Sequence, residues 1–192
     1  SVSEATISDQ VELQNRLLPE GRGMVDLPTP GRQSLRIKWP LPAPPPRVSI
    51  LIPTRNRGRM LQRCVTGLWH QTDYSDIEVI LVDHESTQRR ARRFLDVAES
   101  NANTKVIRYA GPFNFAAMAN RAVEASSGGI LCLLNNDVEI IHEDWLQELI
   151  THLCRPDVGV VGALLLFKDQ TIQHAGIHPG LDGLMGHGHK HR

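Results

Sequence analysis

The sequence contains few cysteines, and they lie far apart. Cys64, Cys132 and Cys154 are odd in number and form no CxxC pair. This pattern argues against a disulfide framework, which needs paired cysteines, and against a zinc knuckle, which needs closely spaced ones. We therefore expect the three thiols to be small buried side chains in a reducing compartment.

Neither an excess of one charge nor a long apolar run is present. The 21 lysines and arginines balance the 21 aspartates and glutamates, so no overall field attracts nucleic acid or an anionic membrane. The longest apolar run without a charge is residues 158–167, which is only ten residues. A membrane-spanning helix needs about 20 such residues. We predict a protein that binds no nucleic acid and has no transmembrane segment.

Prolines gather at one place in the chain. Five of the 12 lie in residues 40–46, inside WPLPAPPPR. Consecutive prolines restrict the backbone and remove hydrogen-bond donors, so this stretch is predicted to be a stiff, extended connector. We expect residues 1–39 to be a weakly structured appendage with one helical stretch, Ile7–Leu18. Residues 47–192 are expected to form the main domain.

Strand-like and helix-like patterns alternate after the connector. Each short apolar run is followed by apolar residues at helical spacing. Such alternation predicts βαβ units around a mainly parallel sheet, and therefore an α/β fold. The strands are expected at 48–52, 77–82, 105–109, 130–134 and 158–167, and the helices at 60–69, 94–98, 115–123 and 145–153.

Polar residues follow three of these strands. They stand at 53–56, 83–86 and 135–139, as PTRN, DHES and NNDVE. In open parallel sheets, ligands bind beyond the carboxyl ends of the strands. The residues that bind a ligand are therefore expected in these three segments.

The first of these segments lacks the glycines that common nucleotide-binding loops need. It reads PTRNRGR, with a single late glycine, and no GxxxxGK[ST] occurs anywhere. NAD-binding and P-loop functions are therefore disfavoured. If a diphosphate binds, a divalent cation held by carboxylates can neutralise it. Asp137 is the first candidate ligand and Glu139 a weaker one, because residues two apart in an extended segment point the same way.

Several motifs together resemble a known family. PRVSILIPTRNR, IEVILVDHEST, GPFNFAAMANRAVEASSGGILCLLNNDVEI, DWLQELI and TIQHAGI occur in this order over residues 47–192. They resemble the family 2 glycosyltransferases of the GT-A fold, in particular the bacterial rhamnosyltransferase-like enzymes of cell-surface polysaccharide synthesis. The resemblance implies an inverting hexosyl transfer from a nucleotide-diphospho-sugar, a UDP- or dTDP-sugar, to a glycan or lipid-linked acceptor. It also implies a divalent cation, Mn²⁺ or Mg²⁺.

The resemblance also implies roles for individual residues. Pro53 and Thr54 match the loop along the nucleoside, and Asp83 matches the acid of the VDxxS motif that contacts base or ribose. Asn135, Asn136 and Asp137 match the DxD-type motif, with Asp137 as the metal-binding acid, and Asn120 matches a helix position facing the donor. A strand-end turn is the alternative role for both aspartates. Arg55 and Arg57 are candidates for phosphate contact, with plain surface exposure as the open alternative.

The chain departs from the family pattern at two positions. His84 stands where many relatives have a second Asp or Asn, which leaves the choice between a UDP and a dTDP donor open. Asn135 replaces the first acid of the DxD motif, so fewer carboxylates remain for the cation.

One arginine-rich segment and one histidine-rich segment give weaker indications of function. Arg89, Arg90, Arg92 and Arg93 are expected to form the solvated face of the second helix rather than to bind phosphate. The terminal histidines are expected to be a frayed tail. His187 or His189 as a cation ligand is the alternative.

The general base of the family is an acid in the second half of these enzymes. No acidic residue follows Asp182 here. We therefore expect a donor-binding half without the acceptor-binding half, inactive by itself. A non-catalytic nucleotide-sugar-binding module and a nucleotidyltransferase are the alternative functions. Activated sugars imply a cytoplasmic protein, with peripheral attachment at the inner face of the membrane left open.

Overall fold

The computed structural model describes residues 12, 14–16, 23–26, 36–179 and 185–187. The chain divides into two compact units, Pro42–Gln147 and a second one that combines Ser1–Leu41 with Glu148–Arg192. Most of the predicted helix Ile7–Leu18 lies outside the described residues, although residues 12 and 14–16 are helical. The predicted boundaries around the proline-rich connector stay predictions.

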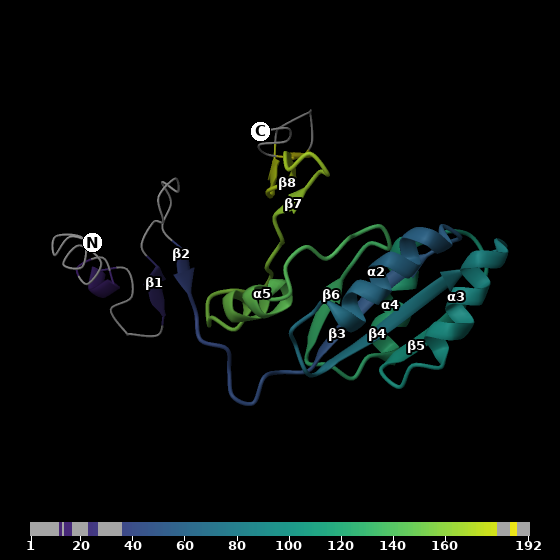
Figure 1. The fold of residues 1–192 in the computed structure, drawn as a ribbon, viewed down its shortest axis with the longest axis horizontal. Coiled ribbons are helices and arrows are strands. Elements are labelled where there is room, and N and C mark those ends of the chain that lie inside the picture. Colours follow the sequence, from purple (N-terminus) through teal and green to yellow (C-terminus); the bar gives the residue numbers. More distant parts are fainter. Residues whose placement is uncertain (1–11, 13, 17–22, 27–35, 180–184, 188–192) are drawn as a thin grey trace. The chain divides into compact units, whose positions relative to one another are not determined.

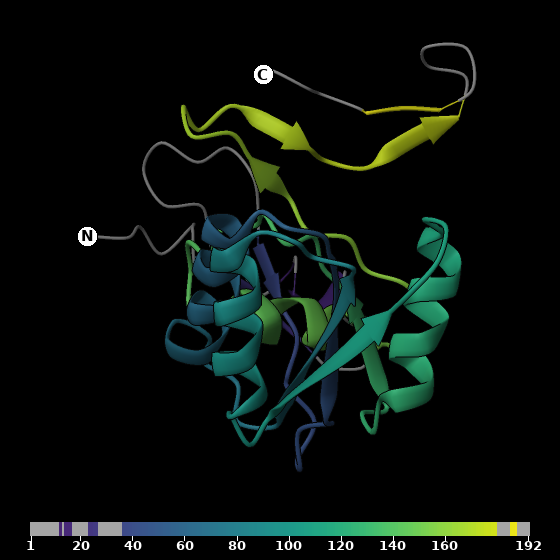
Figure 2. The same cartoon turned by 90° about the vertical axis from the view of Figure 1, so that its right-hand side faces the viewer.

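The Pro42–Gln147 unit contains a four-stranded parallel sheet. Its strands are β3 (Val48–Thr54), β4 (Ile77–His84), β5 (Thr104–Tyr109) and β6 (Ile130–Leu133), in the order β5-β4-β3-β6. Helices α2 (Gly58–His70) and α3 (Arg89–Glu99) cover one face, and α4 (Phe115–Ala125) covers the other (Figures 1 and 2). This confirms the predicted α/β fold with a mainly parallel sheet and helices on both of its faces.

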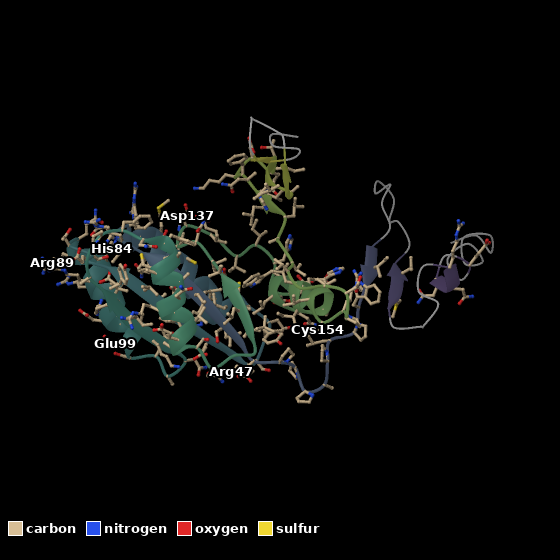
Figure 3. The ribbon with its side chains drawn as sticks, turned by 180° about the vertical axis from the view of Figure 1, so that it is seen from behind. Arg47, His84, Arg89, Glu99, Asp137 and Cys154 are labelled. Carbon is tan, nitrogen blue, oxygen red and sulfur yellow. The ribbon has the colours of Figure 1, made fainter. Side chains whose placement is uncertain are left out.

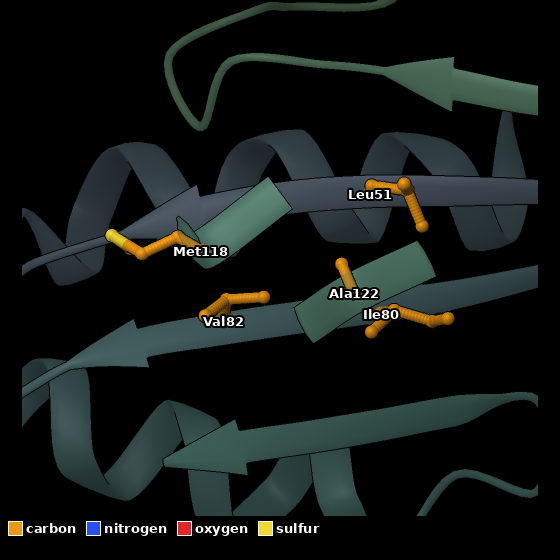
Figure 4. Close-up of a cluster of buried hydrophobic side chains, with 5 residues drawn as sticks. All are labelled: Leu51, Ile80, Val82, Met118 and Ala122. Atoms are coloured by element: carbon orange, nitrogen blue, oxygen red, sulfur yellow. The ribbon is translucent and has the colours of Figure 1, made fainter. Parts of the chain in front are cut away.

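The core of this unit forms where the helices pack on the central strands. Leu51, Ile80 and Val82 of the sheet pack against Met118 and Ala122 of α4 (Figure 4). Alternate strand residues point to the opposite face, which α2 and α3 cover. Nearly all of β3 and β4 is therefore buried, as the continuous apolar runs of a doubly covered parallel sheet require.

The amino-terminal ends of α2 and α3 meet at a glycine. A Cβ atom on Gly58 would lie 2.6 Å from the backbone nitrogen of Ala91. Only glycine permits this approach of one helix start to the other. It brings the segments after β3 and β4 together, which matters for the site below.

The predicted fifth strand is wrong over most of its length. In residues 158–167 only Leu165–Leu166 (β7) is a strand, paired antiparallel with β8 (Ile172–His174) in a separate two-stranded sheet. Val160 is 88% exposed and Leu164 is 61% exposed. An apolar run by itself does not make a strand, because a strand also needs a partner for its backbone hydrogen bonds.

The remaining elements are short. β1 (Met24–Asp26) pairs antiparallel with β2 (Arg36–Lys38), and β9 (Ile177–Pro179) pairs with β10 (Met185–His187). Helix α5 (Trp145–Leu153) crosses the boundary between the two units. Among the residues that the structure describes, no helix has the length and apolar character needed to span a bilayer.

Candidate functional site

Four polar side chains form a row along the carboxyl edge of the sheet. Thr54 of β3 pairs in register with Asp83 of β4, and Asp83 pairs with Arg108 of β5. On the other side, the Asn136 amide Nδ2 donates a 2.8 Å hydrogen bond to the Thr54 hydroxyl. Figure 3 shows Asp137 and His84 at this edge, with Arg47 at the opposite one. The predicted strand-end residues therefore do meet.

Pro53 lies within β3, so the prediction that the strand stops at this proline is wrong. The Leu51 carbonyl accepts a hydrogen bond from the Leu134 amide, on the β6 side. Position 53 has the same parity and faces that side too, beyond the last β6 pairing, Leu51 with Leu133. The missing N–H therefore breaks no ladder hydrogen bond. Arg55, directly after the strand, is exposed.

Asp83 is buried, and other protein groups already bind both of its oxygens. Its Oδ1 accepts a 3.2 Å hydrogen bond from the Ser86 amide, and its Oδ2 lies 3.2 Å from Arg108 Nη1. The aspartate and the serine of the VDxxS motif thus close a turn. This geometry agrees with the turn role, and a contact with base or ribose through the remaining lone pairs stays a prediction.

Asn56 joins the segments after β3 and β4. Its Oδ1 accepts hydrogen bonds from the backbone amides of Thr87 (2.8 Å) and Gln88 (2.9 Å). The backbone amide of Asn56 donates a hydrogen bond to the Ser86 hydroxyl at 2.7 Å. The residue has a φ of 59°, a conformation that asparagine tolerates better than most residues. Sequence reasoning missed this clamp; an asparagine two residues after a strand was the only signal.

His84 packs inside the end of β4. Its side chain is 2% exposed, and its Nε2 lies 2.8 Å from the Gly111 carbonyl. The ring contacts Tyr109 and Phe113, each with a centroid distance of 5.8 Å. Nδ1 is buried and has no hydrogen-bond partner among the described residues. The imidazole is therefore a packing group for the segment after β5 in this arrangement.

Asp137 is exposed in the turn after β6. No described residue donates a hydrogen bond or forms an ion pair with its carboxylate. The neighbouring Asn135 carbonyl accepts a 3.6 Å hydrogen bond from the Cys64 thiol. Burial, and after it the negative charge of Asp137, raises the pKa of that thiol to about 12. An uncompensated carboxylate at the edge of the sheet is a suitable oxygen ligand for a hard divalent cation.

Glu139 is not positioned in the same way. Its Oε1 lies 2.6 Å from Nη1 of Arg63, and both side chains are more than half exposed. Within the described part of the chain, no group of three or more histidines, cysteines or acids could hold a metal ion. A cation that keeps substrate phosphates and water as ligands needs only one or two carboxylates. Asp137 fits that requirement, whereas Glu139 already has a partner.

The other predicted site residues lie elsewhere. Met118 and Ala122 of α4 face the sheet, so Asn120, halfway between them, lies on the opposite, exposed side of the helix. The structure does not bring Asn120 into the row of strand ends. His187 belongs to β10 in the other unit, and His189 and Asp182 lie outside the described residues.

A comparison with protein families shows the family of this chain. The model of the family described as Glycosyl transferase family 2 matches residues 49–178, which include all four members of the row. The chain belongs to glycosyltransferase family 2. Its structure resembles that of the mannosyltransferase PcManGT from Pyrobaculum calidifontis, determined in complex with GDP-Man and Mn²⁺. That likeness has a TM-score of 0.53 at 20% identity, over 81% of this chain and 43% of that one, and agrees with the GT-A fold.

Two curated relatives are considerably longer than this family 2 domain. An uncharacterised protein, y4gI, of Sinorhizobium fredii (strain NBRC 101917 / NGR234) is 43% identical over 157 residues, which are 81% of this chain and 17% of that protein. The O-antigen biosynthesis protein RfbC of Myxococcus xanthus is 35% identical over 175 residues, which are 91% of this chain and 14% of that protein. The chain thus spans less than a fifth of either relative.

Proposed function

We propose that this domain binds a nucleotide-diphospho-sugar at the carboxyl edge of the sheet, as the donor-binding part of an inverting hexosyltransferase. The acceptor in this proposal is a glycan or a lipid-linked saccharide. The observation that carries it is the exposed Asp137 carboxylate, which has no partner in the part of the chain that the structure describes, beside the Asn136–Thr54 hydrogen bond. Membership of glycosyltransferase family 2 supports the reaction class.

Asp137 is the residue that would hold a divalent cation, Mn²⁺ or Mg²⁺, in this proposal. When bound, such a cation stabilises the negative charge that the departing diphosphate gains. The Asn136–Thr54 hydrogen bond holds the turn that carries Asp137, so the carboxylate is positioned before the donor arrives. Thr54, Asp83 and the exposed Arg55 would orient the nucleoside and its phosphates.

In this proposal the general base is none of the three carboxylates Asp83, Asp137 and Glu139, and it belongs to another part of the protein. Asp83 is occupied by Ser86 and Arg108, and Glu139 by Arg63, while Asp137 is assigned to the cation. We therefore propose that these residues bind donor but transfer sugar poorly on their own. Donor binding without any transfer, even in a full-length protein, would instead support a non-catalytic nucleotide-sugar-binding module.

Thermal unfolding tests donor binding. A ligand that binds only the native state raises the melting temperature, by an amount equivalent to about 2.7 kcal/mol at 100 times its Kd. We expect UDP- or dTDP-sugars to raise it only with Mn²⁺ or Mg²⁺ present, and Asp137→Asn to abolish the metal-dependent part. Glu139→Gln, the matched control two residues away, should keep it. A third measurement, with GDP-sugars, tests the prediction that the donor nucleotide is UDP or dTDP.

Two results would contradict the proposal. One is a donor-dependent shift that Asp137→Asn leaves unchanged. The other is a shift with nucleoside triphosphates and none with nucleotide sugars, which would favour a nucleotidyltransferase.

We place the reaction on the cytoplasmic side, where activated sugars are made, with peripheral attachment to the inner face of the membrane.

A further inference from the structure

Helices α2 and α3 form an open groove on the outer surface of the Pro42–Gln147 unit. The groove has a volume of about 650 Å³. Helix α2 lines it with Gln62, Thr66 and Trp69, and the arginines of α3 that line it are Arg89, Arg90 and Arg93. All three arginines are exposed. No acidic residue lines the groove, so it is strongly positive although the whole chain has no net charge.

The acidic residues of α3 do not neutralise these arginines. Asp96 and Glu99 lie 3.7 and 3.5 Å from Nη2 of Arg108, on the β5 side of the helix. Arg89 and Arg93 have no ion pair or hydrogen bond among the described residues. Figure 3 shows Arg89 and Glu99 at opposite ends of α3. The two signs of charge are thus separated along and around this helix.

Local stability does not account for the arginines of the groove. Arg89, Arg90 and Arg93 lie within the first five positions of α3, and no acid occupies its first turn. Cations there oppose the helix dipole, so they are unfavourable for the helix itself. Arg92, between them, has a clear structural role, because its Nε donates a 2.7 Å hydrogen bond to the Ser86 carbonyl. Of the other three arginines, only Arg90 donates a hydrogen bond among the described residues, to the Gln62 side chain at 3.1 Å.

Apolar side chains lie directly beside these charges. Phe94 and the half-buried Trp69 line the groove, with ring centroids 6.1 Å apart. Val97, which is 61% exposed, also lines the groove. Arginines next to an exposed aliphatic residue and an indole are the composition of surfaces that lie at a membrane interface.

We propose that the α2–α3 groove docks this domain on a bilayer surface that contains anionic phospholipid. The guanidinium groups would contact headgroup phosphates, while Val97 and the edge of Trp69 would contact the acyl boundary. The proposal rests on the peripheral attachment put forward above, and it names the surface responsible. A local patch suffices despite the zero net charge, because charges act within about 8–10 Å in physiological salt.

Vesicle co-sedimentation of the whole chain tests this surface. We expect binding to phosphatidylcholine vesicles that contain a quarter phosphatidylglycerol, and little binding to phosphatidylcholine alone. Each arginine near an anionic surface contributes a factor of about five, so Arg89→Ala with Arg93→Ala should weaken binding by about 25-fold. The matched control, Arg121→Ala with Lys168→Ala, removes two exposed charges elsewhere and should change binding by less than about twofold. Val97→Asp, which places a negative charge in the groove, should also weaken vesicle binding.

Each other outcome overturns the proposal. Binding that needs no anionic lipid, or that the Arg89/Arg93 double variant leaves unchanged, excludes this docking surface. Binding to polyglutamate but not to vesicles, lost in the same double variant, points to an acidic protein partner instead. Circular dichroism confirms that the variants fold. The metal-dependent donor shift, measured on the same samples, separates failure of this proposal from failure of the proposed function.

Discussion

Glu78 shows how one buried carboxylate organises the amino edge of the sheet, opposite the site. Its Oε1 accepts hydrogen bonds from the Ser49 and Ser127 hydroxyls and from the amides of Ser127 and Gly128. Its Oε2 lies 3.0 Å from Lys105 Nζ. Burial by itself raises the pKa of Glu78, but these interactions outweigh it and lower the pKa from 4.5 to about 2. The carboxylate joins β3, β4 and β5 to the segment before β6.

The lowered pKa predicts how stability depends on pH. Because the folded-state pKa of Glu78 is below its unfolded value, its contribution is full above about 4.5 and is lost as the pH falls to about 2. The shift corresponds to roughly 3 kcal/mol of unfolding free energy. Urea unfolding should show Glu78→Gln destabilised by about that amount at neutral pH, with the difference shrinking in acid. Glu124→Gln, in an exposed ion pair, should cost less than about 1 kcal/mol.

Asn56 leads to a second prediction for a single side chain. Asn56→Ala removes the acceptor of the Thr87 and Gln88 amides and places alanine at a φ of 59°. We expect a loss of about 2–4 kcal/mol from unsatisfied amides and backbone strain. Asn120→Ala, on the exposed side of α4, is the control and should leave stability within about 0.5 kcal/mol. Equal stability of the two variants would show that the clamp contributes nothing.

The Asn120→Ala control also decides the donor role of Asn120. The resemblance to the family places this residue at the donor, whereas the structure places it on the exposed side of α4, away from the sheet. If it contacts the donor, the metal-dependent thermal shift should fall in this variant.

At the scale of the elements, the contact between two helix starts positions the site. Gly58 allows the start of α2 to touch the backbone of α3 at Ala91. The two helices follow the strands that carry Thr54 and Asp83. Their approach therefore sets the positions of the segments at 55–57 and 85–88 that border the carboxyl edge.

A methyl group at this contact should separate the two helices. Gly58→Ala puts a Cβ atom within 2.6–2.8 Å of the Arg90–Ala91 backbone, which cannot yield as a flexible side chain would. We expect destabilisation of about 1–3 kcal/mol and a weaker donor-dependent thermal shift. Gly129→Ala is the control, because a Cβ there meets nothing within 4 Å. Chemical denaturation that ranks the two variants equally would refute the packing argument.

At the scale of the whole molecule, the row of polar side chains at the strand ends lies within one compact unit, together with Asp137. The Pro42–Gln147 unit contains all of these residues, which are Thr54, Asp83, Arg108, Asn136 and Asp137. This unit has its own sheet with both faces covered by helices. It therefore meets the requirements of an independently folding domain.

Expression of residues 42–153, a fragment that keeps the whole of α5, tests this inference. We expect a cooperative unfolding transition and a metal-dependent donor shift within about twofold of that of the 192-residue chain, since the site residues and their supports are retained. An unfolded fragment by circular dichroism, or a folded one without the shift, would show that residues 1–41 or 154–192 are needed for the fold or the site of this unit.

The order of elements and the places of polar residues could be read from the sequence. Apolar periodicity identified β3 to β6 and α2 to α5, because burial on one or both faces imposes a repeat on each segment by itself. The same reasoning placed Thr54, Asp83 and Asp137 at strand ends. It failed for most of residues 158–167, where only Leu165–Leu166 has a pairing strand among the described residues and several apolar side chains are exposed.

Only the tertiary structure decided which of these residues touch. The pairings of Asp83 with Arg108, of Asn136 with Thr54 and of Glu139 with Arg63 join positions 25 to 82 residues apart. They depend on strand order and register, which the pattern within a single segment does not contain. The arginines of α3 are exposed, as the sequence predicts, but the groove that three of them line depends on the same tertiary information. They line a groove only because α2 packs beside them, and that packing follows from the sheet beneath both helices.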